Sequence, residues 1–134
     1  MKTMNIATPL SLVLAILVAS PAWATERMQS GKWEMTNNAG GRSRASTACV
    51  TPQSANDVNG TSAEVRAFVE RTAATANCTV QSFKLQGDTI AYGMTCRGVP
   101  MESTTIYHGD AYEMTMSSKG TETGRVTAKR VGPC

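Results

Sequence analysis

A four-residue pattern occurs three times in this chain and limits what it can fold into: an aromatic residue, any residue, methionine, threonine. It is found at Trp33–Thr36, Tyr92–Thr95 and Tyr112–Thr115. In an extended strand the side chains alternate, so the aromatic residue and the methionine share one face and the threonine lies on the other. Two copies follow a Gly-Asp turn, at Gly87-Asp88 and Gly109-Asp110. The pattern therefore predicts β-hairpins with one buried and one solvated face.

The same alternation continues elsewhere in the chain and predicts a mainly β fold, a curved antiparallel meander of about seven strands. Short connections favour antiparallel neighbours, and one helical excursion interrupts the meander between the second and third strands. The sequence leaves open whether the sheet partly closes into a barrel. The strands are expected at residues 31–36, 42–50, 79–85, 89–97, 102–108, 111–117 and 125–131.

One amphipathic helix is predicted over residues 61–76. Thr61 and Glu64 have the spacing of a capping box, in which each side chain bonds the backbone of the other residue. Before the helix, Thr51-Pro52 is expected to end the second strand and residues 56–60 to form a loop. The helix is expected to turn one apolar stripe toward the sheet, made of Val65, Phe68, Val69 and Ala73.

The turns also predict the register of two hairpins. A two-residue loop at Gly87-Asp88 brings four apolar side chains onto one face, whereas a shift by one residue would expose half of them. The next hairpin is expected to place Tyr107 opposite Tyr112. In the first hairpin the predicted pairs are Leu85 with Ile90 and Phe83 with Tyr92.

The first 24 residues have the layout of a signal peptide, with cleavage expected after Ala24. Lys2 gives a positive start, residues 10–19 are apolar, and Ala22 and Ala24 occupy the two positions that a signal peptidase reads. The apolar run of about 10 residues is roughly half of what a membrane-spanning helix needs. We therefore expect a single disulfide-stabilised domain over residues 25–134, periplasmic or secreted, with no transmembrane span.

Four cysteines lie in the expected mature chain, at Cys49, Cys78, Cys96 and Cys134. An even number in a small exported chain indicates two disulfides, and no spacing fits the short gap between zinc ligands. Strand directions favour Cys78–Cys96 with Cys49–Cys134, and the alternative is Cys49–Cys78 with Cys96–Cys134. The predicted register puts Cys78 and Cys96 on opposite faces, so their bond requires a β-bulge or fraying.

Charge and motifs exclude several function classes. The formal net charge is +3 and aromatic residues are 5% of the chain, which excludes a nucleic-acid footprint of clustered basic and stacking residues. His108, the one histidine, precedes a Gly-Asp turn and is expected to be an exposed turn residue. No serine lies in a Gly-x-Ser-x-Gly elbow, and no glycine-rich phosphate loop is present. We therefore assign no catalytic residue and no cofactor.

A methionine-based copper site is the one metal alternative. Thioethers bind Cu(I) and imidazole assists. Met114 and Met116 share one face of a predicted strand, and His108 lies at the start of the same hairpin. The competing interpretation is that these methionines fill the core, where their flexibility suits irregular gaps.

Six motifs, taken in order, resemble the DUF3617 family: Gly31–Thr36, Cys49–Pro52, Gly87-Asp88, Met94–Cys96, Gly109–Tyr112 and Lys129–Cys134. The resemblance covers nearly the whole expected mature chain. It implies an exported protein of Gram-negative bacteria; the family has no assigned function, so no catalytic residue is carried over. Members are often richer in methionine between the last strands, where this chain has Ser-Ser-Lys-Gly-Thr at residues 117–121. That departure counts against a role that needs a methionine cluster.

The function expected from the sequence is binding without catalysis, in a small exported β domain that acts as a binding or cell-envelope accessory protein. Its partner would be a small apolar ligand, an envelope component or another periplasmic protein. Two alternatives stay open. One is a periplasmic protein that handles Cu(I) or another metal through His108, Met114 and Met116, and the other is a hydrolase-like enzyme that uses His108.

Overall fold

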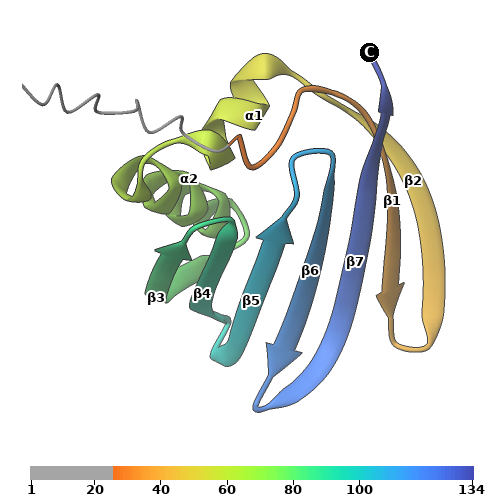
Figure 1. The fold of residues 1–134 in the computed structure, drawn as a ribbon. Helices are drawn as coiled ribbons and strands as arrows, with labels where there is room; N and C mark the ends of the chain where they lie inside the picture. Colours follow the sequence, from red (N-terminus) through yellow and green to blue (C-terminus); the bar gives the residue numbers. More distant parts are fainter. Residues whose placement is uncertain (1–25) are drawn as a thin grey trace, which may run out of the picture.

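The structure, a computed structural model, describes residues 26–134. The predicted signal peptide, with its cleavage point after Ala24, lies outside the described residues. Within them, seven strands form one antiparallel sheet, and two helices lie between the second and third strands (Figure 1). In chain order the elements are β1 (Gly31–Ala39), β2 (Arg42–Val50), α1 (Pro52–Asn59), α2 (Ser62–Thr75), β3 (Cys78–Gln86), β4 (Thr89–Cys96), β5 (Val99–Tyr107), β6 (Ala111–Ser118) and β7 (Thr121–Gly132).

The strand order across the sheet is β2-β1-β7-β6-β5-β4-β3. Strands β3 to β7 follow one another as a meander, whereas the β1–β2 hairpin joins the far side of β7. The two helices therefore carry the chain from one edge of the sheet, β2, to the other edge, β3. The predicted antiparallel sheet is confirmed. It stays open, with β2 and β3 as its edges, so it does not close into a barrel.

Two helices connect β2 with β3, where the sequence predicted one, and this is a correction. Helix α2 confirms the predicted capping box of Thr61 and Glu64. Helix α1 covers residues that were expected to end a strand and form a loop. Proline ends a strand but also suits the first turn of a helix, where its missing N–H is not needed. Thr51 caps α1 by accepting a hydrogen bond from the Ser54 backbone N–H at 3.1 Å.

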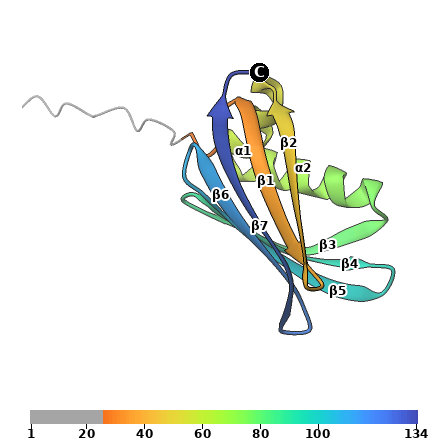
Figure 2. The ribbon, with the colours of Figure 1, turned by 90° about the vertical axis from the view of Figure 1, so that its right-hand side faces the viewer.

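The sheet curves, and both helices lie on its concave side (Figure 2). We call this side the concave face and the other side the convex face. Val58 of α1, Val65 of α2 and Ile90 of β4 form the buried centre of the core between the layers. Trp33 of β1 is completely buried, with its ring centroid 5.7 Å from that of Tyr112 on β6. The helices thus bury one part of the concave face, close to β3 and β4.

The predicted register of both hairpins is confirmed, including the pairs Leu85–Ile90, Phe83–Tyr92 and Tyr107–Tyr112. The register of β3 shifts between Val80 and Ser82. The sequence predicts such an irregularity only because the Cys78–Cys96 bond requires it. The extra residue turns the start of β3 over. As a result Cys78 lies directly opposite Cys96, with their Cα atoms 4.2 Å apart.

Both disulfides pair as the strand directions favoured. Cys78–Cys96 joins β3 to β4, and Cys49–Cys134 joins β2 to the residue that follows β7. The second bond spans 85 positions of sequence and crosses over β1, because β1 lies between β2 and β7 in the sheet. Each bond therefore fastens an edge strand to the interior of the sheet, where an edge is otherwise free to fray.

Candidate functional site on the concave face

Five methionines face the concave side of the sheet, and we call them the methionine band. Met94 pairs directly with Met101 across β4 and β5. All five side chains are partly buried, so each keeps apolar surface that neither the sheet nor the helices cover. The strand registers place on this face Met35, Met94, Met101, Met114 and Met116.

An apolar cavity lies where α2 meets the sheet at one end of this band. It measures about 160 Å³ and runs between the C-terminal half of α2 and the strands below. A cavity of about 150 Å³ with apolar walls stays dry and accepts a benzene-sized molecule. The cavity therefore has room for one ring or one chain end. It is lined by Phe68, Val69, Thr72, Ala73, Ala76, Cys78, Tyr92 and Met94.

A straight row of side chains crosses the concave face from this cavity to the opposite edge. Between Met116 and Arg42 the row contains small residues only, so its floor is low there. An ideal Cβ on Gly124 would lie 3.0 Å from the Met116 Cε atom, which shows that this methionine leans over the glycine. The row, from β3 to β2, consists of Phe83, Tyr92, Ser103, Met116, Gly124, Ala39 and Arg42.

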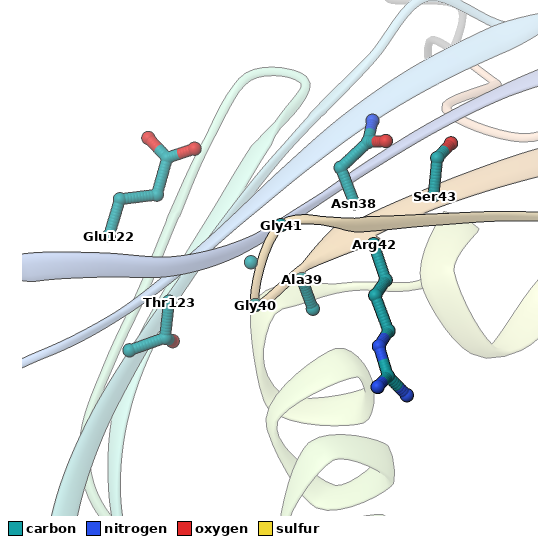
Figure 3. Close-up of a pocket in the computed structure, with 9 residues that line it drawn as sticks. Asn38, Ala39, Gly40, Gly41, Arg42, Ser43, Glu122 and Thr123 are labelled. Carbon is teal, nitrogen blue, oxygen red and sulfur yellow. The ribbon is translucent and has the colours of Figure 1, made fainter.

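The far end of the row opens into a hollow of about 430 Å³ beside the β1–β2 turn. Figure 3 shows Arg42 and Ala39 pointing to one side of the sheet, and Asn38, Ser43 and Glu122 pointing to the other. Alternation along the strands assigns the first pair to the concave face. Arg42 is exposed there.

Charge is divided unequally between the two faces of the sheet. The convex face carries four cations, Lys32, Lys84, Arg125 and Lys129, and four anions, Glu34, Glu102, Glu113 and Glu122. The concave face carries only cations among the described strand residues: Arg42, Arg44 and Arg130. The Arg130 side chain already has a hydrogen-bond partner, because its Nε–H donates to the Ser30 carbonyl at 2.7 Å. Arg42 and Arg44 take part in neither of the two ion pairs found in residues 26–134.

One buried hydroxyl on the row has no partner. Ser103 is 3% exposed, and its Oγ makes no hydrogen bond. Its neighbours across β4 and β6 are Tyr92 and Met116. A buried hydroxyl that forms no hydrogen bond destabilises the fold, so the protein keeps this group at a cost in stability.

The opposite end of the concave face is closed by the segment before β1. Arg27 donates to the carbonyls of Val58 at 2.8 Å, Gly60 at 3.1 Å and Gly87 at 2.9 Å. It therefore ties α1 to the β3–β4 turn. Next to it, the Asn59 side chain makes two hydrogen bonds with the backbone of Met28. Hydrogen bonds therefore link the segment before β1, helix α1 and the β3–β4 turn at this end of the concave face.

Beneath this closure the tyrosines form an apolar cluster. The ring centroids of Tyr107 and Tyr112 are 5.6 Å apart, and the Tyr112 hydroxyl donates to the Met35 Sδ atom at 3.4 Å. Burial raises the pKa of the Tyr107 phenol well above its ordinary value, with smaller contributions from Tyr112 and Tyr92. Burial also raises the pKa of Tyr112. Both phenols are therefore neutral at physiological pH and act as packing groups.

The structure separates the predicted metal-site residues. Met114 and Met116 both lie on the concave face. His108 is exposed in the β5–β6 connection, where its backbone N–H donates to the Ala111 carbonyl. Strand spacing puts its Cα about 10 Å from that of Met114 and about 17 Å from that of Met116 along the sheet. No group of three or more His, Cys, Asp or Glu side chains that could hold a metal occurs within residues 26–134.

Arg42 and Arg44 were not identified from the sequence as the cationic end of the row. Arg42 and Arg44 occupy alternate positions of a predicted strand, which signals that they share a face. Which face this is depends on the pairing with β1. Gly124 lies just before the last strand as predicted, residues 125–131, although β7 already begins at Thr121.

Comparisons with known proteins give one match. The family model described as "Protein of unknown function (DUF3617)" matches residues 28–134. Neither the curated proteins nor the solved structures contain a match. Within the part of the chain that the structure describes, no helix is both long and apolar enough to cross a membrane.

Proposed function

The chain belongs to the DUF3617 family, whose function is unknown, and from its concave face we propose that it is an exported, non-catalytic binding domain for an apolar ligand. The observation that carries this proposal is the methionine band: five apolar side chains that remain partly exposed on one face. Covering apolar surface is favourable by about 25 cal/mol per Å². Methionine is also the side chain that adapts best to ligands of different shape.

Export is supported by the disulfides and by the signal-like segment. Bonds such as Cys49–Cys134 and Cys78–Cys96 persist in oxidising compartments. Mass spectrometry of material from the periplasm and the culture medium tests this part. A mature chain that starts at Thr25 and carries no free thiol is the expected result. An uncleaved, reduced chain in the cytoplasm would contradict it.

The cavity under α2 alone is too small for most ligands, because small-molecule sites usually measure about 300–1,000 Å³. It measures about 160 Å³ and adjoins the methionine band through Met94. We therefore place one end of the ligand in the cavity and the rest along the band.

Fluorescence titration with N-phenyl-1-naphthylamine, a neutral apolar probe, tests this site. Thr72→Trp places a large ring at the mouth of the cavity, because Thr72 is an exposed residue of its lining. Ala74→Trp is the matched control, on the same helix and exposed, but outside the lining. We expect the probe to bind wild type and Ala74→Trp alike and to bind Thr72→Trp at least about fivefold more weakly, since the blocked area is worth about 1 kcal/mol.

Absence of probe binding to wild type would overturn the proposed function. Equal binding by the two tryptophan variants would place the site away from α2. Far-ultraviolet circular dichroism and unfolding curves of both variants separate a blocked site from an unfolded one.

Cu(I) binding is the second candidate, favoured by the direct pairing of Met94 with Met101. Side chains at such positions are about 5 Å apart at Cβ, so two thioethers can reach one ion. The double variant Met94→Leu/Met101→Leu separates the candidates, because leucine keeps the apolar surface and removes the sulfur. Loss of Cu(I) binding with retained probe binding would support copper. Cu(I) titration against a chelator that shows no binding to wild type would exclude it.

A further inference from the structure

We propose that the ligand is a monomeric single-chain amphiphile with an anionic head group, with the head at Arg42 and Arg44 and the chain along the row to Met116. This inference rests on the proposed function and names its ligand class.

Charge complementarity identifies the head group. Arg42 and Arg44 are exposed, lie on alternate positions of β2, and face the same side as the methionine band. Every acidic residue in the described strands faces the other side. A guanidinium group binds carboxylate or phosphate through two parallel hydrogen bonds. An anion at this end of the row therefore meets two arginines. Glu122 also lines the hollow there, but from the convex side, and its carboxylate is paired with Arg125 at 3.1 Å.

The small residues in the row provide space for the chain. Gly124 and Ala39 lie between Met116 and Arg42, and both help to line the hollow beside the β1–β2 turn. A chain on this floor has Val126 beside it and the arginines at its end. The Met116 side chain, whose Cε atom lies over Gly124, has to rotate away to admit the chain, and methionine is flexible enough to do so. Only Gly124 and Ala39 form this low floor, and we therefore assign one alkyl chain to it.

The length of the row also matches the length of an alkyl chain. Neighbouring strands are about 4.8 Å apart, so the three strand steps from β6 to β2 span about 14 Å. The acyl chains of one membrane leaflet span about 15 Å, half of the hydrocarbon thickness.

The shape of the face favours a single molecule over a membrane surface. The sheet is concave and two helices lie within its curve (Figure 2), so a flat bilayer cannot cover the row. The convex face, which a bilayer can approach, carries balanced charge. We therefore assign the cations to one monomeric ligand.

Competition against N-phenyl-1-naphthylamine with ligands of equal chain length and different heads tests the inference. The set is laurate, dodecyl phosphate, dodecanol and dodecyltrimethylammonium, each used as a monomer in low salt, with inorganic phosphate alone as a further arm. We expect both anions to bind about tenfold more tightly than dodecanol, since each exposed arginine contact contributes up to about 1 kcal/mol. The cation is expected to bind most weakly, and inorganic phosphate not to compete.

The double variant Arg42→Gln/Arg44→Gln should remove the preference for anions and leave dodecanol binding unchanged. Lys32→Gln/Lys129→Gln is the matched control, because it removes two positive charges from the convex face of neighbouring strands. It should keep the preference. Gly124→Val raises the floor of the row and should weaken laurate and dodecanol about equally.

The outcomes separate the two proposals. Equal binding of anionic, neutral and cationic ligands would overturn the anionic head and leave the apolar site standing. Loss of the preference in the lysine control would show that net charge, and not the concave arginines, is responsible. Binding to anionic vesicles without binding of monomers would overturn the assignment to a single molecule. No binding of any arm, the neutral probe included, would overturn the proposed function itself.

Discussion

Replacing Ser103 with alanine should make the protein more stable, although the substitution removes a polar group from a tightly packed position. Ser103 is 3% exposed and its Oγ has no hydrogen-bond partner. An unsatisfied buried hydroxyl costs about 1–3 kcal/mol. Ser103→Ala removes this penalty and loses the packing contacts of one oxygen atom, worth roughly 0.5–1 kcal/mol. The expected net gain is about 1 kcal/mol in the free energy of unfolding.

Guanidinium chloride unfolding of the oxidised protein, followed by tryptophan fluorescence, measures this change. Ser118→Ala is the matched control with the opposite sign, because the Ser118 hydroxyl donates to the Pro100 carbonyl at 2.6 Å. Its loss should lower the free energy of unfolding by about 0.5–1 kcal/mol. The midpoint should therefore rise for one serine-to-alanine change and fall for the other, with equal slopes.

A destabilised Ser103→Ala protein would refute the reasoning, because it would mean that the Ser103 hydroxyl has a partner in the folded state. Stability equal to that of wild type would mean that the packing loss cancels the penalty, and that the hydroxyl carries no net cost.

Three further predictions concern stability. Removing the disulfide between β2 and the end of β7 with Cys49→Ala/Cys134→Ala should lower the free energy of unfolding by about 4.5 kcal/mol, because its loop spans 85 positions and the unfolded chain gains more entropy when a long loop is opened. Removing the Cys78–Cys96 disulfide, with a separation of 18, should lower it by about 3 kcal/mol. Coinciding unfolding curves of the two variants would contradict this order. Burial raises the pKa of Tyr107 above the ordinary value of 10.0, so above pH 10.0 the unfolded chain releases a proton that the folded chain retains. Stability should then fall by up to about 1.4 kcal/mol per pH unit, and Tyr107→Phe should have a shallower decline in alkaline unfolding experiments; parallel declines would show that this phenol does not contribute. Thr51→Ala removes the N-cap of α1 and should cost about 1 kcal/mol, measured by thermal unfolding, whereas an unchanged midpoint would show that Pro52 suffices to start the helix.

Much of the local structure of this protein follows from short-range patterns in its sequence. The Gly87-Asp88 turn defined its hairpin to the residue, because a one-residue shift would turn apolar side chains to solvent. The bulge near Ser82 was foreseen as a need of the Cys78–Cys96 bond, and not from the local sequence. Helix α1 was missed because Pro52 is compatible with both a strand end and a helix start.

The long-range arrangement was not accessible to the same reasoning. Pairing of β1 with β7 joins segments about 90 residues apart in the sequence. A period-two pattern predicts a strand but does not identify which strand it pairs with. The proposed binding row depends on this pairing, because Arg42 and Gly124 share a face only once β1 lies between β2 and β7. The sequence showed methionines on one side of each hairpin, but not that the arginines of β2 are on that side too.

The disulfides are nested in sequence, with Cys78–Cys96 inside the segment that Cys49–Cys134 encloses. If the chain is exported as proposed, its N-terminal side crosses the membrane first, so Cys49 can be oxidised together with Cys78 or Cys96 before Cys134 arrives. Oxidation in order of appearance therefore yields mispaired bonds. Correct maturation depends on thiol–disulfide exchange after β7 has emerged. A cell without a disulfide isomerase should accumulate this protein with Cys49 joined to the wrong cysteine.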